Sequence, residues 1–297
     1  MKLETRNQKL FSPSPTGRNR YYAWFGALHT RVDLLFYGPY PEAKFQKVEE
    51  AVRQRLAEIE QMGNRFDPQS ELSQAVRQAY EGSVSLSPEL FALLTRCREA
   101  RLQTGGLFDI TVNSPAFKPG LAQSVELTAD GCLRLHTADV VLDLSGILKG
   151  YALEQLRILL TTKGITDAVV NLGNSSIMAL GDVPLDIPSG HCLTTSGNAT
   201  ATRRHIRNPL TGAFIEGVSL AKVITANAID GEIQSIASFI QTAEMKEKQT
   251  GQTNFFEDRR DRRTCFEDRQ DKRDRRKKES RKDAGTPASC PAPFRNT

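Results

Sequence analysis

The sequence predicts an α+β fold of mixed and antiparallel sheets with flanking helices, and three observations support this. Segments with the two-residue alternation of strands and segments with the helical repeat of apolar residues both recur over residues 21–245. Several of the predicted strands follow one another directly, which differs from the strict strand–helix alternation of a doubly wound sheet. Hydrophobic residues make up 39% of the 297 residues, enough for one large packed domain.

The individual elements follow from periodicity and from capping residues. Residues 42–62 carry apolar side chains along one stripe and end at Gly63, which predicts a helix. Ser87-Pro88 combines a capping serine with a proline suited to the first helical position. In order, the chain is predicted to contain a loose arm (1–20), a strand (31–37), a helix (42–62), a turn-rich loop (65–73), a helix from Ser87-Pro88 to Gly105-Gly106, strands (108–112, 132–136, 140–144), a helix after Ser145-Gly146 that ends at Gly164, strands (167–172, 177–180, 193–195, 204–206, 218–225) and a last helix from Ile229.

The stretch from Leu142 to Leu156 joins a predicted strand, a Ser-Gly turn and an amphipathic helix. Such a junction collects backbone N–H groups at a helix N-terminus, where partial positive charge favours phosphate. Lys149 falls at the same point. The alternative is an ordinary turn with a solvated lysine, which we favour for the stretch in isolation because its spacing is not that of a Walker A loop.

The net charge of +5 is confined to the C-terminal tail. Residues 251–297 contain 14 Lys/Arg and 9 Asp/Glu, whereas residues 1–250 contain 26 of each. A neutral body gives no support for a nucleic-acid-binding surface on the folded domain. The sequence Phe-Glu-Asp-Arg occurs at Phe256 and again at Phe266 among alternating charges. Residues 246–297 are therefore predicted to form a charged, low-complexity, disordered tail, or at most a solvated helix.

Cysteines and apolar runs bear on the cellular compartment. The five cysteines are scattered and far from zinc-ligand spacing, as is typical of idle thiols in a reducing compartment. No stretch approaches the ~20 apolar residues of a membrane span. Residues 1–20 lack the apolar centre of a signal peptide, so a cytoplasmic location is expected.

Several polar motifs stand in a fixed order along the neutral body. They are Phe66-Asp67-Pro68 with Ser70-Glu71-Leu72-Ser73, Gly105-Gly106-Leu107-Phe108-Asp109-Ile110-Thr111-Val112, Leu142-Asp143-Leu144-Ser145-Gly146 with Lys149-Gly150-Tyr151-Ala152, Asn171-Leu172-Gly173, Thr194-Thr195-Ser196-Gly197-Asn198, and His205 to Gly212. Together they resemble the FAD:protein FMN transferase family, also called the ApbE or thiamine-biosynthesis lipoprotein family. The resemblance covers residues 25–239.

The resemblance implies a single ApbE-like (T-fold-like) domain over residues 21–245 that holds FAD in a cleft. Family members use Mg²⁺ to cleave the FAD diphosphate, pass the FMN half to a threonine hydroxyl of an acceptor protein and release AMP. Phosphoryl transfer of this kind depends mainly on positioning and on neutralising charge. Many members work outside the cytoplasmic membrane, which is the alternative to a cytoplasmic location.

The resemblance also implies roles for single residues. The catalytic set is His205, Asp143 and Lys149, and the flavin platform is Phe66. For His205, for Asp109 and Asp143, and for residues 195–197, ordinary turn or capping roles remain alternatives. The implied cofactor-binding residues are Phe25, Gly26, Phe66, Ser70, Gly106, Asp109, Ser145, Gly146, Lys149, Thr195, Ser196, Gly197 and His205.

The implied metal site is where the sequence departs most from the family pattern. Its ligands would be Glu232, the backbone carbonyl of Leu148 and a hydroxyl four residues after Glu232. That last position is Ile236, which cannot coordinate a metal, so Ser235 is the alternative ligand. The charged tail also replaces the last strands of the family.

These departures keep two other functions open. One is an FAD-binding protein of the same fold with lost or weakened transfer. The other is an interaction protein that acts through its charged tail. For the transferase, the expected partners are FAD, Mg²⁺ and an acceptor protein with a flavinylation threonine, and no membrane span is expected.

Overall fold

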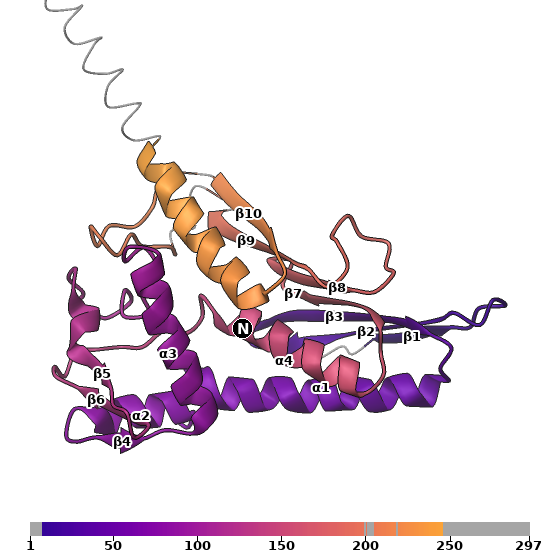
Figure 1. Cartoon of the computed structure of the whole chain (residues 1–297), viewed down its shortest axis with the longest axis horizontal. Helices are drawn as coiled ribbons and strands as arrows, with labels where there is room; N and C mark the ends of the chain where they lie inside the picture. Colours follow the sequence, from indigo (N-terminus) through magenta and orange to yellow (C-terminus); the bar gives the residue numbers. More distant parts are fainter. Residues whose placement is uncertain (1–7, 199, 201–204, 218, 246–297) are drawn as a thin grey trace, which may run out of the picture. The chain divides into compact units, whose positions relative to one another are not determined.

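The computed structural model describes residues 8–198, 200, 205–217 and 219–245 (Figure 1). The labelled elements all lie within residues 1–243. They are β1 (Gln8–Ser12), β2 (Asn19–Ala27), β3 (Thr30–Gly38), α1 (Glu42–Gly63), α2 (Glu71–Ala79), β4 (Val84–Ser85), α3 (Pro88–Gln103), a 3₁₀ turn (Leu121–Ser124), β5 (Val125–Leu127), β6 (Cys132–Leu135), α4 (Leu148–Thr162), β7 (Asp167–Leu172), β8 (Ser176–Leu180), β9 (Cys192–Asn198) and β10 (Ser219–Thr225). A further helix covers residues 228–245.

Two antiparallel sheets confirm the α+β fold class. The larger sheet has seven strands in the order β1-β2-β3-β7-β8-β9-β10, and every neighbouring pair in it is antiparallel. The smaller sheet has the order β4-β6-β5. Because β7, β8, β9 and β10 are consecutive in both chain and sheet, the C-terminal half of the large sheet is a meander.

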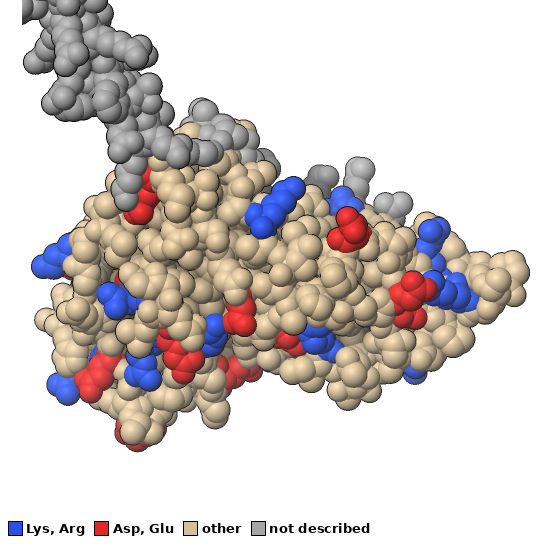
Figure 2. Space-filling model, turned by 45° about the horizontal axis from the view of Figure 1, so that its top comes forward, with Lys and Arg blue, Asp and Glu red and all other residues tan. Residues whose placement is uncertain are grey.

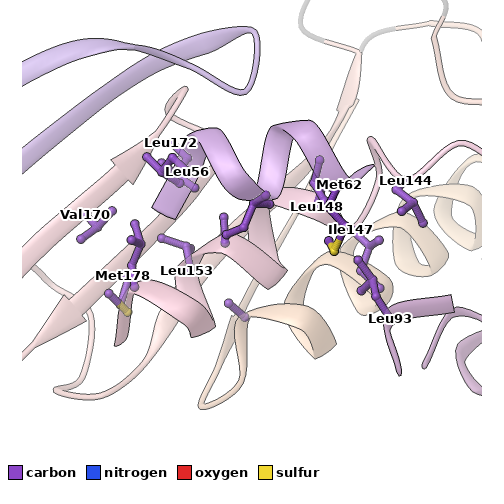
Figure 3. Close-up of a cluster of buried hydrophobic side chains, with 14 of the residues drawn as sticks. Leu56, Met62, Leu93, Leu144, Ile147, Leu148, Leu153, Val170, Leu172 and Met178 are labelled. Atoms are coloured by element: carbon purple, nitrogen blue, oxygen red, sulfur yellow. The ribbon is translucent and has the colours of Figure 1, made fainter. Parts of the chain in front are cut away.

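One face of the large sheet carries the core. Alternate residues of β2 and β3 are buried, as the two-residue period requires. Helices α1 and α4 pack against each other and against this sheet (Figure 1). Figure 3 shows the apolar side chains at this junction, among them Leu56 and Met62 of α1, Leu148 and Leu153 of α4, and Val170, Leu172 and Met178 of β7 and β8.

Capping explains where two of the helices begin. The Ser87 hydroxyl accepts a hydrogen bond from the Leu90 amide at 3.2 Å, with Pro88 at the first position of α3, as predicted. The Ser70 hydroxyl accepts from the Ser73 amide at 3.1 Å and opens α2. The sequence analysis did not predict α2, because it took the serine-rich segment 65–73 as loop throughout.

Several other local predictions were wrong. Residues 8–12 of the expected loose arm form β1, which pairs along its length with β2, a strand that was not predicted. Residues 108–112 form a turn, in which the Asp109 carboxylate accepts from the amide and the hydroxyl of Thr111. Residues 140–144 belong to no strand, and the amides of Val141 and Asp143 donate to Ser114 Oγ and to the Ile110 carbonyl.

The remaining predicted elements are confirmed within a few residues, apart from 204–206. Residue 204 lies outside the described part, and residues 205–206 are not in a strand. The tail from residue 246 onward also lies outside the described residues.

Surface charge in the described part is mixed. Figure 2 shows basic and acidic side chains interspersed on the face drawn, as expected for a neutral body. Among the described residues, no helix combines the length and the apolar character that crossing a membrane would require.

Candidate functional site

The first turn of α4 faces helix 228–245 at very short range. A Cβ atom on Gly150 would lie 2.5 Å from the Ala228 carbonyl oxygen and 2.7 Å from Glu232 Cγ. A Cβ on Gly146 would lie 3.1 Å from Ile236 Cδ1. At position 150 only glycine permits this approach, so Gly150 sets the distance between the two elements, whereas the contact at Gly146 is with the flexible end of the Ile236 side chain.

Several other motifs connect to this turn, directly or through one another. The Asp143 amide donates to the Ile110 carbonyl at 2.8 Å, which joins the 105–112 and 142–146 motifs. A Cβ on Gly106 would lie 3.2 Å from Leu210 Cδ2, which joins the 105–112 and 205–212 motifs. Arg65 forms an ion pair with Asp143 at 2.8 Å and brings in the loop before α2. Segments far apart in sequence therefore meet around the N-terminus of α4.

Asp143 organises this turn from a buried position. One carboxylate oxygen accepts from the Ser145 amide at 2.9 Å. The other accepts from Asn113 Nδ2 at 2.7 Å and pairs with Arg65. The amides of Ile147 and Leu148 both donate to the Leu144 carbonyl. The turn therefore has fewer free amide donors than predicted, since the amide of Ser145 is already bonded within the chain.

Phe66, the predicted flavin platform, lies on the surface beside Arg65 and His29. Its side chain is 64% exposed, which is unusual for a phenylalanine beside polar motifs. The Arg65 guanidinium lies 4.1 Å from its ring centre, and the His29 ring meets its edge with centres 6.2 Å apart. His29 comes from the β2–β3 hairpin, where Glu60 of α1 accepts the Leu28 amide at 2.9 Å. An exposed aromatic held by a cation fits the stacking of a planar ring system.

Lys149 and Glu232 belong to one polar cluster, in which Glu232 and Ser176 are buried and Lys149 and Ser175 are partly buried. The Lys149 ammonium donates to the Ser175 hydroxyl, and the Ser176 hydroxyl donates to Glu232 Oε1 at 2.6 Å. Glu232 is only 4% exposed. Burial raises the pKa of its carboxyl, while the charge of Lys149 and the Ser176 hydrogen bond lower it in part. Lys149 and Glu232 were predicted from the sequence, whereas neither Ser175 nor Ser176 was named as a site residue.

The residues around Glu232 do not fit a divalent cation. Ser235 is fully buried and its hydroxyl is bonded to Ser196 Oγ at 2.7 Å. Ile236 directs a methyl group at Gly146, and Leu148 offers only its backbone carbonyl. In the described part of the chain, no three His, Cys, Asp or Glu side chains gather closely enough to hold a metal. Mg²⁺ needs near-octahedral oxygen ligation, and here it would find one carboxylate beside a lysine.

Three other residues predicted to bind the cofactor, Phe25, Ser70 and Asp109, make packing, capping or turn contacts within the chain itself. Phe25 is a core residue, 2% exposed, with the Arg53 guanidinium 3.8 Å from its ring centre, so its side chain does not offer a surface to flavin. Ser70 caps α2, and Asp109 is bonded to Thr111 and to Arg101 Nε at 3.1 Å. Gly26 has open space beside its Cα.

Residues 195–197 lie within β9 and do not form a tight turn. The Thr195 amide donates to the Ser175 carbonyl at 2.7 Å, which connects β9 to the Lys149 cluster. Gly197 has a φ of 146°, and a Cβ there would lie 2.2 Å from the Ser219 carbonyl oxygen of β10. His205 is exposed and follows residues 201–204, which are not described.

Two residues that sequence analysis missed complete the turn, namely Arg65 and Asn113. Arg65 stands next to Phe66, so its basic charge beside a predicted platform was a usable indication. Asn113 follows the Thr-Val of the second motif and carries no pattern of its own. A separate hollow of about 1080 Å³ is bounded by α1, α2 and the start of α3, and it contains none of the predicted site residues.

Comparison with known proteins adds a family and a fold. The model of the ApbE family matches residues 28–254. The structure resembles flavin transferase ApbE from Vibrio cholerae with a TM-score of 0.62 and 16% identity, covering 74% of this chain and 86% of that one. It resembles the ApbE protein of Thermotoga maritima with a TM-score of 0.64 and 19% identity, covering 77% and 89%.

A third similar structure is the flavinyl transferase ApbE of Pseudomonas stutzeri in its apo form. The TM-score is 0.60 and the identity 16%, with 80% of this chain and 85% of that one covered. No curated protein matches the sequence significantly. At such low identities the three structural similarities establish the fold.

Proposed function

The chain belongs to the ApbE family, and on that basis we propose that it transfers the FMN half of FAD to a threonine hydroxyl of an acceptor protein and releases AMP. The observation that carries the proposal is the meeting of motifs from distant parts of the sequence around the first turn of α4. That turn combines a helix N-terminus, a lysine and a neighbouring exposed aromatic. The helix N-terminus and the lysine suit a diphosphate, and the exposed aromatic suits a flavin ring.

The proposed reaction is an exchange at the phosphorus of the FMN half. The threonine oxygen forms a new bond to this phosphorus, and the bridging bond to AMP breaks. Lys149 is proposed to hold the diphosphate, and the Arg65–Phe66 pair the flavin. His205 is proposed to accept the proton of the threonine hydroxyl, because a histidine can exchange a proton near neutral pH. Asp143, named above as catalytic, acts through the turn that it organises.

The proposal extends to the domain and its surroundings. Residues 21–245 are taken as the FMN transferase domain, with residues 246–297 as a tail. Mg²⁺ belongs to the proposed reaction conditions because the family resemblance implies it, although the surroundings of Glu232 form no complete ligand set. The cytoplasmic location stays a prediction.

A direct assay tests the proposal. The full chain is incubated with FAD, Mg²⁺ and an acceptor protein bearing the flavinylation threonine, and AMP and the flavin adduct of the acceptor are measured. We expect both products, and neither with an acceptor in which this threonine is alanine. A folded chain that yields neither product with the intact acceptor would overturn the proposal.

One alternative is favoured by a specific observation. Ile236 places an aliphatic side chain where the family pattern has a hydroxyl, which favours an FAD-binding protein with weak or absent transfer. This alternative predicts stoichiometric FAD binding without AMP. An interaction protein acting through the tail would instead bind no FAD.

A further inference from the structure

The carboxylate of Glu232 sits in a closely defined environment. Its Cγ lies against Gly150, where a Cβ would come within 2.7 Å. Its Oε1 accepts from Ser176 Oγ at 2.6 Å, and Ser176 is itself fully buried. Glu232 thus faces the first turn of α4 and the start of β8, and few directions of approach remain for another ligand.

The charge of a lysine on α4 acts on this carboxylate without a direct ion pair. Lys149 immediately precedes Gly150, and its ammonium donates to the Ser175 hydroxyl. Ser175 and Ser176 are neighbours in the chain, with hydroxyl oxygens 3.5 Å apart. The two serines therefore connect the ammonium and the carboxylate through a short hydroxyl bridge.

A divalent cation would have to compete with this arrangement. A metal ion at Glu232 would be repelled by the Lys149 ammonium, whose charge acts on this poorly solvated carboxylate. It would find no second ligand on helix 228–245, because the Ser235 hydroxyl is bonded both to Ser196 and to the Glu232 carbonyl at 3.1 Å, and Ile236 is aliphatic. An ammonium has no such ligand requirement, since three hydrogen-bond acceptors satisfy it.

We propose that in this chain the Lys149 ammonium, held by Ser175, serves as the cation beside Glu232 in place of a bound divalent metal. The inference rests on the proposed function only in that the same ammonium then faces the diphosphate. Ser175 and Ser176 are positioning residues in this account: one holds the cation and the other orients the carboxylate. The consequence is weak binding of divalent cations to the chain alone.

Mn²⁺ is a suitable probe, because it shares the oxygen ligands of Mg²⁺ and its free concentration is measured by electron paramagnetic resonance. The FAD-free full chain is titrated as wild type, as Lys149→Met and as the matched control Lys163→Met, an exposed lysine at the other end of α4. We expect weak binding to the wild type and to the control. Lys149→Met should bind Mn²⁺ about tenfold more tightly, because the repelling charge is gone.

Further variants identify the ligand. Lys149→Arg keeps the charge and should show no gain in Mn²⁺ affinity. The double variant Lys149→Met with Glu232→Gln should lack the gain that Lys149→Met shows alone. Tight binding of Mn²⁺ to the wild type that depends on Glu232 would overturn the inference, as would the absence of a gain in Lys149→Met. If Lys149→Met does not fold, Lys149→Gln takes its place. Tight binding of Mn²⁺ to the wild type would by itself still contradict the inference.

The metal titration separates this inference from the proposed function. It uses neither FAD nor an acceptor, so a chain that forms no AMP can still show the expected gain in Mn²⁺ affinity. Conversely, a chain that forms AMP and also binds Mn²⁺ tightly through Glu232 keeps the proposed function and loses the inference.

Discussion

Asp143 and Glu232 are both buried carboxylates of the candidate site, and the structure holds them in opposite ways. Asp143 receives a guanidinium, a side-chain amide and a backbone amide. Glu232 accepts one hydrogen bond, from the Ser176 hydroxyl, and is otherwise stabilised only by the charge of Lys149, without a direct ion pair. The pKa of the Glu232 carboxyl is raised by burial.

The comparison distinguishes a charge whose hydrogen-bonding capacity is used to hold the local structure from a charge whose capacity is largely unused. A buried charge surrounded by donors stabilises a particular local conformation, and removing it leaves its partners unpaired. A buried charge with few donors costs free energy and is retained mainly where a ligand or a reaction uses it. Asp143 therefore builds the α4 turn, and a part for Glu232 in the chemistry of the site remains our proposal.

The largest effect is expected from a substitution that disrupts the close approach between Gly150 of α4 and the helix that carries Glu232. Gly150→Val would insert a branched side chain where even a Cβ lies 2.5 Å from a backbone oxygen. We expect the free energy of unfolding to fall by about 3 kcal/mol through overpacking. Chemical denaturation measures this fall.

Gly82→Val is the matched control, because a Cβ on Gly82 meets nothing within 4 Å. It should change stability by less than about 0.5 kcal/mol, as is usual for surface positions. Equal losses in both variants would show that the contact between α4 and helix 228–245 is not tight.

The next largest effect is expected from removing the Asp143 carboxylate, which has three hydrogen-bonding or ion-pair partners. Asp143→Ala deprives Arg65 and Asn113 of their shared acceptor, and we expect a loss of about 1–3 kcal/mol, reduced because Arg65 is partly solvated. Thermal or chemical unfolding gives the value, with the exposed Asp186→Ala as control. A loss no larger than that of the control would remove the structural role assigned to Asp143.

A smaller effect concerns pH and Glu232. Since the folded state raises the pKa of this carboxyl above its unfolded value of 4.5, the folded state binds the proton more tightly. Its contribution to stability is complete below the unfolded pKa and is lost as the pH rises through the folded pKa. Glu232→Gln should remove this loss, so its stability should fall less than that of the wild type from about pH 4 to neutral pH.

The exposed Glu81→Gln serves as control and should follow the wild type. Identical pH dependence of the wild type and Glu232→Gln would show that Glu232 is compensated as fully as Asp143, and the contrast between the two carboxylates would fail.

The smallest effect tests Ser235. Its hydroxyl bonds to Ser196 at 2.7 Å within the core, so Ser196→Ala and Ser235→Ala should each cost about 1 kcal/mol. The double variant should cost less than the sum, because neither hydroxyl is then left unpaired. Additive losses would mean that Ser235 is free for another role, including the metal ligation considered from sequence.

The sequence predicted regular elements well and local hydrogen bonding poorly. The helix over 42–62 and the strand over 31–37 were found because periodic apolar residues report burial on one face. Residues 140–144 have the same apolar character, with Leu142 and Leu144 buried, yet their backbone bonds to a turn. Burial and strand pairing are different properties, and the apolar pattern reports only the first.

The candidate site shows the same limit. The motifs predicted that residues 142–152 and Glu232 lie at the centre, and the structure brings these residues together. Sequence could not show that the Ser145 amide is used by Asp143, or that Ser175 holds Lys149, because both depend on side-chain geometry between neighbouring segments. The burial of Phe25 could not be foreseen because it follows from β2, a strand that was not predicted.

The affinity of the full chain for FAD, measured with wild type and Lys149→Ala by fluorescence titration, tests the central claim most directly. If Lys149 faces the diphosphate, its loss removes a charge-assisted hydrogen bond and should weaken FAD binding by about 1–3 kcal/mol, roughly 5- to 150-fold. Lys163→Ala should bind FAD as the wild type does. An affinity of Lys149→Ala within about twofold of the wild type, with folding intact, would contradict the placement of FAD at the N-terminus of α4.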